Sequence, residues 1–238
     1  MSPYEQNVVR EVKVWKLKMN RRSSLLQRVS KKAQNKVNSI IPDRVHQFVT
    51  ESVKKLVQAT LFGSEFTTKS RKLGTLSLQE REQEIQKALD SYRRTAVIEG
   101  AGTGAGGIFL GMADFPLLLA IKMKLLFEVA SLYGFDVKEY EERLFILHVF
   151  QLAFSSDEHR RTILRTIEQW ETRKEHLKTV DWQKFQQEYR DHIDFIKMLQ
   201  LLPGIGAVVG AYANYNLLNQ LGETAMNAYR IRLLLSES

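Results

Sequence analysis

Asp114 is the acidic side chain whose sequence setting most suggests chemistry, because apolar residues surround it in GMADFPLLL (111–119). A carboxylate in such surroundings could pair with a base such as Arg93 or Arg94, or gate a pocket. It could also cap the first turn of a helix that opens at Pro116, since a carboxylate accepts the free amides there. We favour the helix cap and treat Asp114 as a candidate functional polar residue.

Glu188 and His192 lie four residues apart and so share one face of a helix. A metal site would need a third and a fourth ligand, which only distant residues such as His148 or His176 could supply. His192 also belongs to an apolar stripe, which favours a half-buried histidine. The chain has no cysteine, so it has neither thiol nucleophiles nor disulfides. We therefore predict no catalytic residue and no metal ligand, and keep Glu188 and His192 as candidate functional polar residues.

Gly102, Gly104 and Gly107 match the phosphate-binding spacing G-x-G-x-x-G. A dinucleotide site needs a strand directly before these glycines, so that the turn presents backbone amides to the phosphates. The preceding residues, EIQKALDSYRRTAVIE (84–99), have helical periodicity instead. A Walker loop would need Lys and then Ser or Thr after the last glycine, where this chain has Ile108 and Phe109. We expect no nucleotide and no other cofactor.

Glycines four residues apart favour close helix packing. They occur in two segments, 100–121 and LLPGIGAVVGAYANYNLLNQLG (201–222). A glycine inside a helix costs roughly 0.5–1 kcal/mol relative to alanine, so such a set needs compensation from packing. The residues concerned are Gly102, Gly106, Gly107, Gly111, Gly204, Gly206 and Gly210. We predict two glycine-rich helical hairpin segments packed in the core. A membrane-associated hairpin is the alternative, whereas Asp114, Pro116 and Pro203 disfavour a true membrane span.

The elements that would position these residues are all helices. Apolar residues recur at steps of three and four along most of the chain, and no segment alternates as a strand would. Three start signals recur, namely Ser77 with Glu80, Asp136 with Glu139, and Ser155 with Glu158. We predict an all-α multi-helix bundle. The polar, glycine-containing segment 62–75 is the best candidate for a linker. We therefore predict two parts, basic amphipathic helices (1–74) and a helical core (75–238).

The first part of the chain is strongly basic. Residues 1–74 hold sixteen of the 35 Lys and Arg but five of the 27 Asp and Glu, and the whole chain carries +8. The cations expected to contact an anionic surface are Lys16, Lys18, Arg21, Arg22, Arg28, Lys31, Lys32 and Lys36. Interleaved Trp15, Leu17 and Met19 make this arm amphipathic, which suits an anionic membrane surface. Nucleic acid is the less favoured partner because no recognition motif is visible. A solvated helix surface and a docking face for a protein remain open.

The run GAGTGAGGIFLGMADFPLLLAIKMKLLFEVASLYGFD (100–136), with ERLFILHVFQLAF (142–154) and the glycine-rich C-terminal block, resembles the EcsC family. This resemblance implies a bacterial protein associated with an ABC transporter system linked to secretion, with ABC transporter subunits as partners. The resemblance carries over no reaction, cofactor or catalytic residue, and it leaves the chemistry and any small-molecule ligand open.

Together with the absence of cysteine and of a secretory signal, the resemblance leads us to expect a cytoplasmic protein peripheral to the inner face of the cell membrane. We expect a non-catalytic accessory or regulator of the transporter. The alternatives are a hydrolase acting on a lipid or peptide in a cleft between helices, and a helical protein-binding module with no membrane role.

Overall fold

The computed structural model describes residues 1–20, 43–63, 66, 76–102, 107–155, 157–178 and 207–235. The elements in this part of the chain are eight helices, which confirms the predicted all-α fold. They are α1 (Pro3–Asn20), α3 (Asp43–Phe62), α4 (Leu78–Gly102), α5 (Gly107–Tyr133), α6 (Tyr140–Phe154), α7 (Asp157–Glu168), α8 (Trp170–Lys178) and α11 (Ala207–Leu234).

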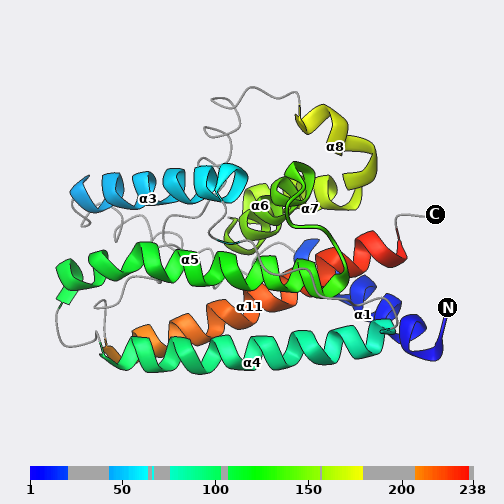
Figure 1. Ribbon diagram of the computed structural model, residues 1–238, viewed down its shortest axis with the longest axis horizontal. Coiled ribbons are helices and arrows are strands. Elements are labelled where there is room, and N and C mark those ends of the chain that lie inside the picture. The colour runs from blue at the N-terminus through cyan, green and yellow to red at the C-terminus, as the bar shows by residue number, and fades with distance from the viewer. Residues whose placement is uncertain are drawn as a thin grey trace.

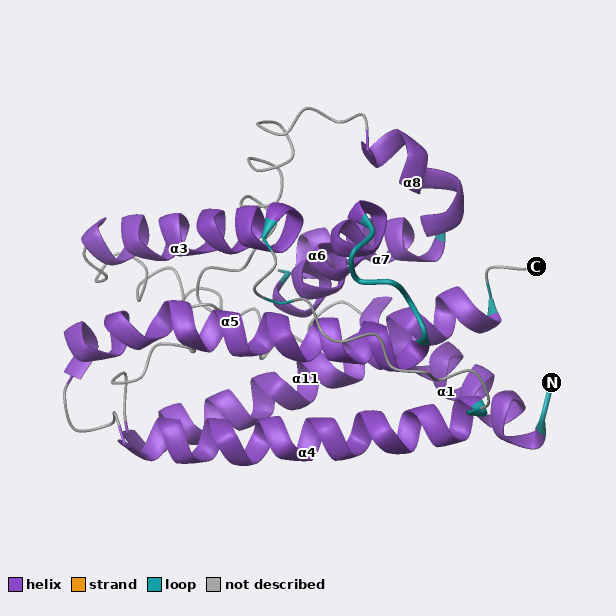
Figure 2. Ribbon diagram, in the orientation of Figure 1, coloured by secondary structure: helices purple, strands orange, loops and turns teal. Residues whose placement is uncertain are grey.

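Three long helices form the frame of the bundle. In Figure 1, α4 and α11 run side by side, α5 lies over them, and α3 lies over α5. The shorter α6 and α7 lie beside α3, and the start of α1 and the last turn of α11 lie at the same end of the bundle. Figure 2 shows that helices account for nearly all of the described chain.

The start of α4 is encoded locally. The backbone amide of Ser77 donates to Glu80 Oε2 at 2.7 Å, and the backbone amide of Glu80 donates to Ser77 Oγ at 3.3 Å. This is the reciprocal capping box expected from the sequence, and it satisfies donors that the first turn would otherwise leave unpaired. The prediction for this helix start is confirmed.

The other two start signals behave differently. The carboxylate of Asp136 accepts the amide of Lys138 at 2.9 Å, so it closes a local turn, while α6 begins only at Tyr140. The hydroxyl of Ser155 donates to the Gln151 carbonyl at 2.7 Å, back into the preceding helix. At Asp136 the short-range hydrogen bond replaces the cap, so the predicted helix start there is wrong. At Ser155, α7 does begin directly afterwards, at Asp157, and the capping box with Glu158 stays a prediction because the side chain of Glu158 is outside the described part.

The C-terminal end of α5 is held by a glycine turn and by an arginine from α4. Gly134, with a φ of 97°, ends α5 in a Schellman arrangement, in which Phe135 N bonds Ala130 O at 3.1 Å. Arg81 Nη1 donates to the Tyr133 carbonyl at 2.7 Å at the same terminus. A cation at a helix C-terminus also meets the negative end of the helix dipole.

Helix α6 passes through the middle of the core. Every residue from Leu144 to Phe154 is buried, and Phe145 packs edge-on against Trp170 at 5.0 Å between ring centroids. Residues before and after position 75 belong to the same core, for example Val12 in α1, Val53 in α3 and Leu221 in α11. Most of the expected linker lies outside the described residues, although Phe66 is buried against Phe127 at 5.8 Å.

The expectation that Asp114 caps a helix is wrong. Both Asp114 and Pro116 lie inside α5, well after its start at Gly107, so Asp114 caps no helix. An internal proline removes one backbone hydrogen bond. Phe115, Leu118 and Leu119 are nearly fully buried around it, and this burial offsets the loss.

The glycine segments are described only in part. Gly102, Gly107, Gly111 and Gly210 lie within helices, whereas Gly106, Gly204 and Gly206 lie outside the described residues, as do the surroundings of all seven. Their mutual packing stays a prediction. Gly222, at the end of the second segment, does mark a close approach of α11 to α4, because a Cβ there would lie 2.5 Å from Leu89 Cδ2.

Candidate functional site

Helix α1 buries one face and exposes another. Val8, Val12 and Trp15 are at most 5% exposed and belong to the core of the bundle. Trp15 is therefore a core residue, and the expectation that it contacts a membrane is wrong. Met19 is partly buried against the same core, which leaves Leu17 as the exposed member of that trio.

The exposed side of α1 combines aliphatic and cationic side chains. Val14 is 67% and Leu17 is 65% exposed, and Lys13 is exposed beside them. We call Lys13, Val14 and Leu17 the outer face of α1. Arg10 and Lys18 flank it, since residues three and four apart are neighbours on a helix surface.

Two predicted cations of the arm already have partners within the protein. Lys16 Nζ lies 2.6 Å from Glu168 Oε1, and Lys18 Nζ lies 3.7 Å from Glu223 Oε1. Lys18 remains 73% exposed, so it is available to a second anion. The other predicted cations, Arg21, Arg22, Arg28, Lys31, Lys32 and Lys36, lie outside the described residues.

Beside the outer face, residues of α1, α4 and α11 line an open pocket of about 750 Å³. This volume falls within the usual range for small-molecule sites, roughly 300–1,000 Å³. Asn7, Gln86, Asn219 and Asn227 line it with amides, and Trp15, Leu89 and Met226 give it apolar walls. The combination of apolar wall and polar groups is typical of a binding site.

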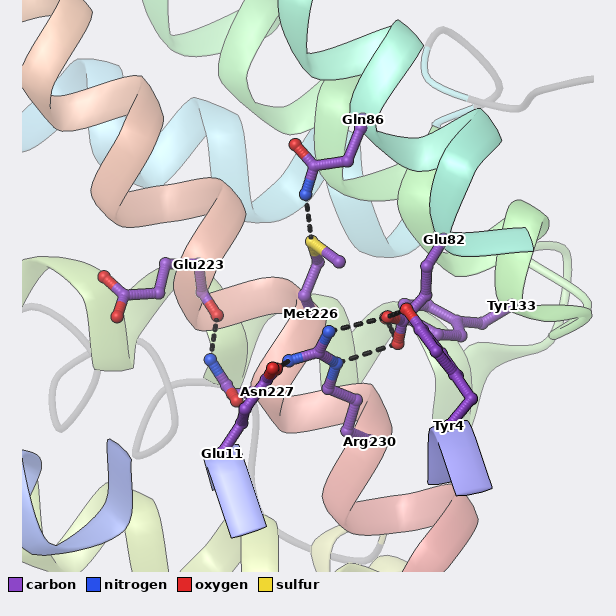
Figure 3. Close-up of polar contacts among 9 residues, drawn as sticks. All are labelled: Tyr4, Glu11, Glu82, Gln86, Tyr133, Glu223, Met226, Asn227 and Arg230. Atoms are coloured by element: carbon purple, nitrogen blue, oxygen red, sulfur yellow. Dashed lines mark hydrogen bonds and ion pairs between the residues drawn. The ribbon is translucent and has the colours of Figure 1, made fainter. Parts of the chain in front are cut away.

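Three buried polar atoms in the residues lining this pocket have no hydrogen-bond partner. They are Nε of Arg93 and the Oδ1 atoms of Asn219 and Asn227. The amide nitrogen of Asn227 donates to the Glu223 carbonyl at 2.8 Å, which fixes its oxygen as the unpaired atom (Figure 3). These three atoms have almost no accessible surface, so they lie behind the pocket wall and do not open into the pocket. A buried polar atom left unpaired costs about 1–3 kcal/mol.

The pocket ends at a buried ion pair between α4 and α11. Arg230 donates from Nε and Nη2 to the two oxygens of Glu82 at 2.8 and 2.6 Å, and Tyr4 donates to the same carboxylate at 2.6 Å (Figure 3). Tyr133 adds a fourth bond at 2.9 Å, and Glu11 of α1 lies 3.1 Å from Arg230. Helices distant in sequence thus meet at one carboxylate.

The environment keeps Glu82 ionised. Burial by itself raises the pKa of Glu82, but the hydrogen bonds from Arg230 and Tyr4 and the charge of Arg230 outweigh it, so the pKa lies below its ordinary value. Burial and the neighbouring Glu82 raise the pKa of Tyr4 to about 12. A carboxylate that accepts four hydrogen bonds and holds no proton is suited to structure and not to acid–base catalysis.

A second buried network connects α6 with α11. Tyr229 and Arg232 both bond the carboxylate of Glu142, and the guanidinium of Arg232 lies 4.1 Å from the ring centre of Phe135. Burial raises the pKa of Glu142 in spite of the nearby Arg232. Sequence reasoning did not identify these four charged residues, because Glu82 and Arg230 are 148 residues apart and Glu142 and Arg232 are 90 residues apart.

Most of the polar side chains singled out from the sequence lie outside the described residues, so their roles stay predictions. Asp114 lies in α5 with its side chain outside the described part, and Glu188 and His192 are outside it altogether. His148 is buried, with Nδ1 bonded to the Leu144 carbonyl at 2.8 Å. The residues before Gly102 are helical, as expected, and so lack the strand that a dinucleotide site requires.

This arrangement defines an all-helical bundle with a polar inter-helix pocket. The sequence profile of the EcsC protein family matches residues 6–234, and the chain belongs to that family. It is 54% identical to Protein EcsC of Bacillus subtilis (strain 168) over 229 residues, which cover 96% of each chain. It is 34% identical to the uncharacterized protein YdbA of the same organism over 157 residues, 64% of this chain and 58% of YdbA. No solved structure matches.

Proposed function

We propose that this EcsC-family protein is a peripheral membrane protein that assists or regulates an ABC transporter from the cytoplasmic side of the membrane. The observation that carries the membrane part is the outer face of α1, where exposed Val14 and Leu17 lie among Arg10, Lys13 and Lys18. Among the described residues, no helix is long and apolar enough to cross a bilayer. A surface contact of this mixed kind suits the interface between lipid head groups and acyl chains.

Charge and apolar contact have separable roles in this proposal. Each cation near an anionic surface contributes about 1 kcal/mol, and the contribution falls with salt over a Debye length of about 8 Å. Six further cations follow α1 between residues 21 and 36. Leu17 and Val14 supply the part of the binding that salt does not screen.

The test is sedimentation of the full chain with vesicles of phosphatidylcholine alone or of phosphatidylcholine with about 30% phosphatidylserine. Each vesicle type is measured at low and at physiological salt. We expect binding that rises with phosphatidylserine, falls with salt and weakens in Lys31→Glu/Lys32→Glu. The same charge change in Lys54→Glu/Lys55→Glu, on α3, should have a much smaller effect. Leu17→Ser should weaken the salt-resistant binding, whereas Leu117→Ser, also at an exposed leucine, should not.

Two results would contradict the membrane part. One is indifference to acidic vesicles at low salt. The other is retardation of duplex DNA or RNA at physiological salt without vesicle binding, which would assign the cations to phosphate contacts. The transporter part is tested by crosslinking the native membrane fraction and identifying the crosslinked peptides by mass spectrometry. Transporter subunits should be recovered with the wild type and lost with Leu17→Ser.

A further inference from the structure

We propose that the pocket between α1, α4 and α11 receives the head group of a membrane phospholipid that carries a primary ammonium next to its phosphate, as phosphatidylethanolamine does. In this role, which rests on the membrane contact proposed above, the pocket selects one kind of lipid from the bilayer. Val14 connects the two surfaces, because it is 67% exposed on the outer face of α1 and also lines the pocket. A bilayer that touches this face has its head groups beside the pocket.

The accessible charges in the pocket lining balance one another. Two cations and two carboxylates are exposed to solvent, namely Arg10, Lys18, Glu11 and Glu223. The other cations of the lining, Arg93 and Arg230, are paired with Asp90 and Glu82 at 2.7 and 2.6 Å. Because the exposed charges sum to zero, they complement a zwitterionic ligand better than a purely anionic or cationic one.

One pair of exposed charges is open enough to admit a ligand. Lys18 Nζ and Glu223 Oε1 lie 3.7 Å apart, which is longer than a direct N–H···O hydrogen bond of about 2.7–3.2 Å. The carboxylate of Glu223 is turned away from the cluster around Arg230 (Figure 3). Exposed ion pairs of this kind contribute little to stability, so these two charges separate at low cost.

Each charge of the head group then has a partner of opposite sign. Lys18 offers N–H donors to the phosphate oxygens, and the carboxylate of Glu223 accepts hydrogen bonds from the ammonium of the lipid. Val14 lies one turn before Lys18 on the same side of α1, where it contacts the glycerol and the first acyl carbons. The phosphate therefore lies on the α1 side of the pocket and the ammonium on the α11 side.

The second exposed carboxylate of the pocket is too distant to share the same ammonium. Glu11 pairs with Arg230 at 3.1 Å while Lys18 pairs with Glu223, so α1 and α11 run antiparallel. Glu11 precedes Lys18 on α1 by about 10 Å along the helix axis, at 1.5 Å per residue. Glu11→Gln is therefore a matched control for Glu223→Gln, since it removes the same charge at the other end of the pocket.

The lining also distinguishes ethanolamine from choline. A primary ammonium donates hydrogen bonds to a carboxylate, whereas a quaternary ammonium has no N–H and is bound mainly by aromatic cages. The aromatic residue in the lining is Trp15, which is 5% exposed and belongs to the core. Among the residues that line it, the pocket thus offers exposed carboxylates and no aromatic cage.

The test is sedimentation of the full chain with vesicles that contain about 30% phosphatidylglycerol, an anionic lipid without an ammonium. The remainder is either phosphatidylethanolamine or phosphatidylcholine. We expect the wild type to bind the ethanolamine vesicles more tightly, by about threefold or more, through the charge-assisted hydrogen bonds to Glu223. Glu223→Gln should bind both vesicle types equally, whereas Glu11→Gln should keep the preference of the wild type. Thermal unfolding of each variant shows whether the bundle is intact, and Glu51→Gln, on the exposed side of α3, supplies the same charge change if Glu11→Gln does not fold.

Binding that requires the anionic lipid but is equal for the two vesicle types in the wild type would overturn the head-group site and leave the membrane contact standing. A preference retained in Glu223→Gln would also overturn it, because lipid packing and not the carboxylate would then cause the gain. Failure to bind any acidic vesicle would overturn the site together with the membrane contact. Soluble glycerophosphoethanolamine separates the two sources of this chemistry. Its binding in isothermal titration, without any preference between the vesicles, would assign the pocket to a small molecule and overturn the lipid.

Discussion

At the scale of single residues, the most consequential group is a carboxylate that sequence reasoning did not identify. Glu82 is 2% exposed and joins α1, α4, α5 and α11 through Tyr4, Tyr133 and Arg230. Burying an ion pair does not by itself stabilise a fold, but removing one partner leaves the other charge uncompensated. The pair therefore makes the register of α4 against α11 costly to change.

Glu82→Gln should lower the free energy of unfolding by about 3–5 kcal/mol at neutral pH, because it leaves the buried charge of Arg230 with Glu11, whose side chain is 62% exposed, as its remaining carboxylate partner. Urea denaturation followed by circular dichroism measures the change. Glu84→Gln, on the outer side of the same helix, should cost less than about 0.5 kcal/mol. Because the pKa of Glu82 is lowered in the fold, its contribution is complete above the unfolded pKa of about 4.3 and disappears as the pH falls through the folded value. The gap between wild type and Glu82→Gln should narrow in that acidic range, and a gap of constant size would contradict this.

Tyr4→Phe tests how the same network contributes to stability at alkaline pH. A tyrosine whose pKa is raised to about 12 stabilises the fold below its unfolded pKa of about 10, and that contribution is lost as the pH rises from about 10 to 12. The variant should lose about 1–2 kcal/mol near neutral pH through the missing hydrogen bond to a charged group. Its unfolding free energy should also fall less steeply than that of wild type above pH 10. Tyr215→Phe, at an exposed ring, is the control, and equal slopes in Tyr4→Phe and wild type would refute the assignment.

At the scale of elements, the contact between α4 and α11 depends on a glycine. Leu89 is 2% exposed and occupies the space that a side chain at position 222 would need. A methyl group added at position 222 would push the end of the Leu89 side chain into neighbours that are already closely packed. Such overpacking strains side-chain rotamers and the backbone.

Gly222→Ala should therefore destabilise the protein by about 1–3 kcal/mol, despite the better helix propensity of alanine. In a Leu89→Ala background the same change should cost much less, because its steric partner is gone. Chemical denaturation of the two single variants and the double variant gives the coupling energy, expected at about 0.5–3 kcal/mol. Additive effects would show that the two helices do not meet at this point.

At the scale of the whole molecule, α1 belongs to the bundle and also offers a face to its surroundings. The family match begins at residue 6, within this helix. Val8, Val12 and Trp15 enter the common core, while the outer face remains exposed. Val14 and Trp15 also line the pocket, so the outer face of α1 and the pocket lie next to each other and share Val14.

Trp15→Ala should cost about 3–5 kcal/mol of unfolding free energy, because it empties a large buried site. Leu17→Ala should change stability by less than about 0.5 kcal/mol, because Leu17 is 65% exposed. Thermal unfolding of both variants measures the difference. If Leu17→Ala were the more destabilising, the two faces of α1 would be wrongly assigned.

The all-helical fold was predictable from the sequence because a helix is specified over a few residues. The stripe of Val8, Val12 and Trp15 and the capping box of Ser77 and Glu80 each lie within two or three turns. Family membership was visible for the same reason, in two continuous glycine-rich blocks.

The candidate site was not predictable in this way. The periodicity of α1 shows that one face is apolar, but such a face can be buried either in lipid or against other helices. Only the packed bundle shows that Trp15 lies in the protein core. Likewise, Arg230 and Glu82 are 148 residues apart, and nothing local distinguishes them from exposed charges. Their pairing, the pocket beside it and its unpaired amides exist only once α1, α4 and α11 have packed, because burial turns an ordinary polar side chain into one that requires a partner.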